Sequence, residues 1–93
     1  MRVAQIIEQK LTAALEPAQI EVIDESHLHE GHAGAREGGE SHFRVTIVAD
    51  AFTDLNRVAR QRKVYEVLAD ELAGPIHALA LSTMTPTEAD SRA

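Results

Sequence analysis

A chain of 93 residues is long enough for one small domain and too short for a second independent core. Its 44% hydrophobic and 26% charged residues are typical of a folded chain, and its 3% aromatic content means that the core must be mainly aliphatic. A net charge of -6 opposes undirected binding to nucleic acid or anionic lipid, and the lack of cysteine excludes disulfides, thiol nucleophiles and cysteine-based metal sites within the chain.

The first predicted elements are a helix followed by a strand. Apolar residues recur at intervals of three and four over residues 2–15, which predicts an amphipathic helix, and Pro17 prevents it from continuing. Over residues 19–25, Ile20 and Val22 fall on one face of an extended chain and Glu21 on the other. This alternation is typical of a strand.

Residues 26–41 form the most unusual segment of the sequence. They contain four of the five glycines, three of the five histidines and no apolar periodicity, which predicts a loop of about sixteen residues. Loops of that length are uncommon in small domains and are usually functional.

A second strand follows the loop, since apolar Phe43, Val45 and Ile47 alternate with Arg44 and Thr46. It can pair antiparallel with the first strand, so that the loop connects the two strands of a hairpin.

The C-terminal half of the chain predicts a long helix, a strand and a short helix. An apolar stripe begins at Leu55, continues to Leu72, and is stopped by Gly74 and Pro75. Residues 76–83 then form a short apolar strand, and a right-handed crossover places it parallel to the second strand. Thr85, Pro86 and Glu88 stand at the N-cap, N1 and N3 positions of a capping box, which predicts one helical turn. We expect residues 89–93 to be frayed.

The predicted order is therefore helix, strand, strand, helix, strand and a possible terminal helix. This order indicates a single two-layer α/β (α+β) domain over residues 1–88, with helices on one face of a three-stranded mixed sheet.

Several separated motifs resemble the BolA family. They are, in chain order, Asp24-Glu25-Ser26, the histidine-bearing glycine loop, Glu40-Ser41-His42-Phe43-Arg44-Val45, Phe52, Arg60, Arg62, Val64-Tyr65, Leu68, Ala69, Glu71-Leu72 and His77-Ala78-Leu79. The resemblance spans residues 5–88 and implies a KH-like fold of class II topology. Many members carry histidine where this chain has Gln61, so the histidines to consider are those of the loop and His77.

Histidines are the candidate metal ligands of this cysteine-free chain. His27, His29 and His32 lie within six residues, and imidazole is a common ligand of transition metals, although solvated loop histidines are an equally simple interpretation. Without the resemblance, His77 would be interpreted as a structural residue of the third strand that makes hydrogen bonds. The resemblance implies instead that His77 is a ligand of a [2Fe-2S] cluster and that a loop residue is the second ligand. Counted from the motif at 24–26, that residue is His29, with His32 the alternative and His27 third; His42 is assigned a structural role.

The resemblance also implies a partner. The cluster is shared with a monothiol glutaredoxin, which supplies thiolates together with its glutathione, and histidine can replace cysteine on one iron of such a cluster. We therefore expect a non-catalytic, monomeric chain that holds no cluster when isolated and acts with its partner in iron–sulfur cluster trafficking or iron-linked regulation. No apolar run reaches 18 residues and the N-terminus does not read as a secretory signal, so the expected location is the cytoplasm, without a membrane association.

A basic stretch supports an alternative, a DNA-binding transcriptional regulator. Arg57, Arg60, Arg62 and Lys63 fall within seven residues of the predicted long helix, although such a run is more often a solvated helix face. The turn at 50–56 lacks the Gly-X-X-Gly arrangement with which KH modules clamp a nucleic-acid backbone. An enzyme is disfavoured, because the sequence has no nucleophile motif, phosphate loop or dinucleotide fingerprint.

Overall fold

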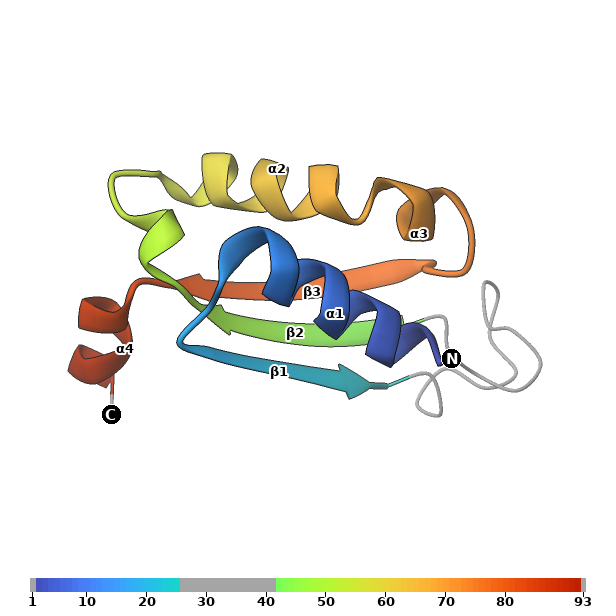
Figure 1. The fold of residues 1–93 in the computed structure, drawn as a ribbon, viewed down its shortest axis with the longest axis horizontal. Helices are drawn as coiled ribbons and strands as arrows, with labels where there is room; N and C mark the ends of the chain where they lie inside the picture. Colours follow the sequence, from blue (N-terminus) through green and yellow to red (C-terminus); the bar gives the residue numbers. More distant parts are fainter. Residues whose placement is uncertain (1, 26–41, 93) are drawn as a thin grey trace.

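The computed structural model of the chain describes residues 2–25 and 42–92. Within these ranges the elements follow the predicted order (Figure 1). They are α1 (Val3–Leu15), β1 (Gln19–Asp24), β2 (His42–Val48), the 3-10 turn η2 (Asp50–Phe52), α2 (Arg57–Val67), α3 (Ala69–Ala73), β3 (Ala78–Met84) and α4 (Pro86–Arg92).

The strands of the described residues form one mixed sheet in the order β1-β2-β3. β1 and β2 are antiparallel, with Val22 opposite Val45, and β2 and β3 are parallel, with Val45 opposite Leu81. The antiparallel hairpin and the parallel crossover predicted from the sequence are both confirmed. β3 lies at one edge of the sheet.

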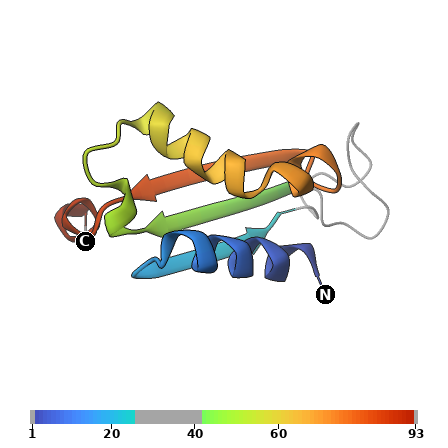
Figure 2. The ribbon, with the colours of Figure 1, turned by 45° about the horizontal axis from the view of Figure 1, so that its top comes forward.

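The helices α1, α2 and α3 cover one face of this sheet, and α4 lies beyond the end of β3 (Figures 1 and 2). The core between the two layers is mainly aliphatic, and its two largest side chains are Phe43 and Phe52. The two-layer α+β fold, with helices on one face and the KH-like class II order, is therefore confirmed. No helix in the described ranges is long and apolar enough to span a bilayer.

α1 ends as its sequence predicts. Ile7, Leu11 and Leu15 are buried at intervals of four and form its inner face. The next residue, Glu16, adopts the left-handed conformation (φ 45°, ψ 56°), and its N–H donates to the Thr12 carbonyl at 3.0 Å.

The predicted long helix is two helices, because Leu68 leaves the helical conformation at ψ 19° between α2 and α3. The apolar stripe could not reveal this break, since Val64, Leu68 and Leu72 keep their four-residue spacing across it. Glu71 of α3 is buried and pairs with Lys10 of α1 at 2.9 Å, which ties the helices together. The hydrogen bond to Glu71 raises the pKa of Lys10.

Two boundaries near the C-terminus differ from the prediction. β3 begins at Ala78, two residues later than expected, because the Ile76 N–H bonds the Glu71 carbonyl at 2.9 Å before the strand starts. The capping box is present, with Thr85 N–H to Glu88 Oε1 at 2.8 Å and Glu88 N–H to Thr85 Oγ1 at 3.2 Å. The helix that it begins continues to Arg92, so residues 89–92 are helical where we expected a frayed tail.

Candidate functional site

The two histidines of the described residues meet at one end of the sheet. His77 immediately precedes β3 and is exposed, whereas His42 opens β2 and is only 7% exposed. Their ring centroids are 5.3 Å apart, because the register places His42 opposite Ala78, the residue after His77. The sheet thus presents one accessible imidazole supported by a buried one.

The loop histidines His27, His29 and His32 lie outside the described residues, so the structure does not test their roles. The residues on either side of that segment are described, and they are joined: the Glu25 N–H donates to the His42 carbonyl at 2.8 Å. The chain therefore leaves β1 and enters β2 at the end of the sheet where His77 lies.

The carboxylates at this end of the sheet are paired with arginines. Glu25 Oε2 lies 3.2 Å from Arg44 Nε, and Asp24 Oδ2 lies 3.8 Å from Arg2 Nη2. Both carboxylates therefore have structural partners.

The described residues contain no preformed cluster of metal-ligating side chains. Within 2–25 and 42–92, no group of three or more histidine and carboxylate side chains is placed to bind one ion. The exposed His77 imidazole can supply a single ligand.

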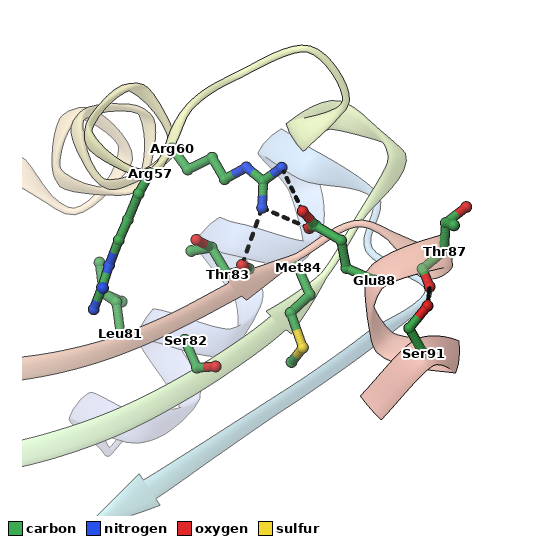
Figure 3. Close-up of a pocket in the computed structure, with 9 residues that line it drawn as sticks. All are labelled: Arg57, Arg60, Leu81, Ser82, Thr83, Met84, Thr87, Glu88 and Ser91. Carbon is green, nitrogen blue, oxygen red and sulfur yellow. Dashed lines mark hydrogen bonds and ion pairs between the residues drawn. The ribbon is translucent and has the colours of Figure 1, made fainter. Parts of the chain in front are cut away.

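Arg60 is turned into the fold and is not exposed with the other basic residues of α2, whereas its predicted contact with nucleic acid stays a prediction. Its side chain is 12% exposed and lies 5.9 Å from the centre of the Phe52 ring. The guanidinium donates to the Thr83 carbonyl at 3.2 Å and to both carboxylate oxygens of Glu88 at 2.7 and 3.3 Å (Figure 3). It also donates to the Leu55 carbonyl at 2.9 Å. Its donors are thus used within the fold.

The other three basic residues of α2, Arg57, Arg62 and Lys63, are exposed. Two large apolar side chains of the same helix are also exposed, Val58 by 55% and Tyr65 by 40%. Three cations remain available to phosphate, one fewer than the sequence indicated.

Glu88, the partner of Arg60, was predicted only as a capping residue. Hydrogen bonds from the Arg60 guanidinium and then from the Thr85 N–H lower the pKa of its carboxyl from 4.5 to about 2. The pair joins α2 to α4 beside a groove at the edge of β3, which the sequence did not reveal (Figure 3). The sequence predicted that β3 is parallel to β2 but did not place β3 at the edge of the sheet.

This architecture defines a small α+β domain of KH-like topology with an accessible histidine at one end of the sheet. A family profile described as BolA-like protein matches residues 11–88, and the chain belongs to the BolA family. It is 46% identical over 88 residues to the DNA-binding transcriptional regulator BolA of Escherichia coli, covering 95% of this chain and 80% of that protein.

Two solved plant structures have the same fold. BolA1 from Arabidopsis thaliana superposes with a TM-score of 0.86 at 40% identity, over 95% of this chain and 96% of that one. The BolA domain of SufE1 from the same plant gives 0.82 at 41% identity, over 91% and 93%. The whole SufE-like protein 1 is much longer, and the match covers 23% of it.

Proposed function

We propose that this chain is a non-catalytic partner of a monothiol glutaredoxin and shares a [2Fe-2S] cluster with it. The observation that carries the proposal is the exposed His77 imidazole, held beside His42 at the end of the sheet in a cysteine-free member of the BolA family. The complex would act in iron–sulfur cluster assembly or trafficking, or in iron-linked regulation.

The chemistry of the donors explains why the cluster would be shared. An isolated chain that offers one described imidazole and no thiolate lacks the ligands that a two-iron cluster requires. The glutaredoxin and its glutathione would supply the thiolates, and this chain would supply His77 with His29 or His32. On this proposal the free chain is a monomer without cluster, and the complex is a heterodimer.

Histidine ligation gives the complex a dependence on pH. Only an imidazole with a deprotonated nitrogen can bind a metal, so acid competes with the cluster for His77. The function of this chain would be to hold and orient that ligand, and the buried ring of His42 restricts the space in which it can move.

The test is anaerobic reconstitution of the full chain with a monothiol glutaredoxin, glutathione, iron and sulfide, followed by visible circular dichroism. We expect a spectrum that differs from that of glutaredoxin alone and that is lost in His77→Ala. His29→Ala and His32→Ala, measured separately, identify the second ligand. His27→Ala is the matched control, a loop histidine whose loss should leave the spectrum unchanged.

Two results would contradict the proposal. One is a mixture whose spectrum equals that of glutaredoxin alone, and the other is a distinct spectrum that persists in His77→Ala. Urea unfolding of His77→Ala shows whether the variant is folded, so that a lost spectrum is not mistaken for a lost fold.

The second candidate function is DNA binding. It is supported by the name of the Escherichia coli relative and by the exposed Arg57, Arg62 and Lys63 of α2. If Arg62 and Lys63 contact phosphates, replacing both with Ala should weaken binding to a duplex and flatten the log K against log salt slope by about 1.8. An unchanged slope would remove α2 as the DNA site.

A further inference from the structure

The outer edge of β3 is the floor of a groove of about 490 Å³ at the end of the strand away from His77 (Figure 3). Its walls are the start of α2 and the helix α4 (Figures 1 and 3). The lining residues of β3 are consecutive, Leu81 to Met84, so the groove follows the direction of the strand. Four residues of a strand extend about 13 Å.

The backbone of β3 offers hydrogen-bonding groups to this groove. The Met84 carbonyl accepts from Ala49 N–H on the inner side of the strand. Because adjacent residues of a strand point their N–H and C=O groups to opposite sides, those of Leu81 and Thr83 point outward. The Thr83 carbonyl accepts a hydrogen bond from Arg60. The other three outward groups, the Leu81 N–H, the Leu81 C=O and the Thr83 N–H, make no hydrogen bond within the described part of the chain.

Among the charged side chains that line the groove, Arg57 has no oppositely charged partner in the described part of the chain. Arg60 and Glu88 neutralise each other at 2.7 Å, whereas Arg57 is exposed and makes no ion pair with any described residue. Hydroxyl groups of Ser82, Thr83, Thr87 and Ser91 complete the lining. The groove therefore combines a strand edge that is only partly hydrogen-bonded with one available guanidinium.

We propose that this groove binds an extended acidic peptide segment of a partner protein, which adds to β3 as a fourth strand. Main-chain bonds to Leu81 and Thr83 would hold the segment in register, and a carboxylate of the segment would pair with Arg57. Because α2 and α4 flank the strand edge, a single extended chain suits the groove better than the sheet edge of a second copy, which would bring its own helices. Among the described residues that line the groove, Arg57 is the one cation without an ion pair, and in a chain of net charge -6 this favours a peptide over a nucleic acid.

This site is independent of the histidine site. The nearest lining residue of β3, Leu81, is four residue steps from His77, or about 13 Å, so a segment confined to the groove leaves His77 accessible. One partner could be held at the groove while another molecule contacts His77. Failure of either proposal leaves the other unaffected.

The experiment selects peptides of about 12 residues from a random phage-displayed library against the full chain, then measures fluorescein-labelled winners by fluorescence anisotropy. We expect the selected peptides to contain an acidic residue among β-branched residues. In NMR spectra of the isotopically labelled protein, their addition should shift the backbone amide resonances of residues 81–84. Arg57→Glu should weaken binding about tenfold or more. Arg62→Glu, an exposed arginine of the same helix that does not line the groove, is the matched control and should leave Kd within about twofold.

Backbone pairing is tested separately from charge. N-methylation of the alternate peptide amides that face β3 should abolish binding, whereas methylation of the other set should not. Thr83→Pro removes an outward N–H without breaking a bond to β2, so it should weaken binding in a folded protein. Three results would overturn the proposal: no enriched peptide, equal effects of the two methylation sets, or an oligodeoxythymidine that binds the groove with dependence on Arg57 while the peptides do not.

Discussion

The Arg60 guanidinium donates to the carbonyls of Leu55 and Thr83 and to the carboxylate of Glu88, so its loss should destabilise the fold. Replacing Arg60 with Met retains an aliphatic stem of similar length, so packing changes little, but it removes the guanidinium. At about 1.5 kcal/mol for each charged hydrogen bond, the bonds to the Leu55 and Thr83 carbonyls together contribute about 3 kcal/mol. We add nothing for Glu88, because its side chain is 48% exposed and such ion pairs contribute little.

The assay for Arg60→Met is urea unfolding, read by far-ultraviolet circular dichroism. We expect the free energy of unfolding to fall by about 3 kcal/mol, equivalent to a Tm lower by roughly 12–24 °C for a domain of this size. Arg62→Met, at an exposed position of the same helix, should change it by less than about 0.5 kcal/mol. A loss in Arg60→Met as small as that of Arg62→Met would refute the structural role, and would return Arg60 to the DNA-binding surface.

Three further substitutions test other features of the fold. Glu16→Gly should raise the free energy of unfolding by about 1 kcal/mol, because glycine tolerates φ 45° and the substitution removes a negative charge from the C-terminus of α1. The control Glu16→Gln removes only the charge, so it should give only the smaller part of this increase. Glu88 has a lowered pKa in the fold, so its contribution is complete above pH 4.5 and is lost as the pH falls toward about 2. Urea unfolding at pH 6 and pH 3 should therefore show a larger acid loss in the wild type than in Glu88→Gln, and equal losses would contradict the assignment. Ile47→Ala should cost about 3–4 kcal/mol at a fully buried core position, whereas Ile23→Ala, 41% exposed, should cost less than about 1 kcal/mol; similar costs would mean that the core is misplaced.

The sequence by itself determined the order and type of the elements. Three local patterns carried this information: the intervals of four in α1, the alternation in β1 and β2, and the capping box at Thr85. Each pattern is compatible with one backbone conformation, which either buries the apolar face of the element or pairs the free N–H groups at the start of a helix. The boundaries were less accurate, because an apolar run does not distinguish Ile76, which is buried before β3 begins, from the strand residues that follow it.

Only the tertiary structure decided which residues meet across the fold. Arg60 and Glu88 are 28 residues apart, and nothing in the basic stretch of α2 indicates that one of its arginines is turned toward α4. His42 and His77 become neighbours through the parallel register of β2 and β3, and the outer edge of β3 acquires walls only when α2 and α4 pack beside it. The spacing of apolar residues predicts which side chains of a helix or strand face the core. It does not predict which residues those side chains contact, because these contacts depend on how elements distant in the chain pack together.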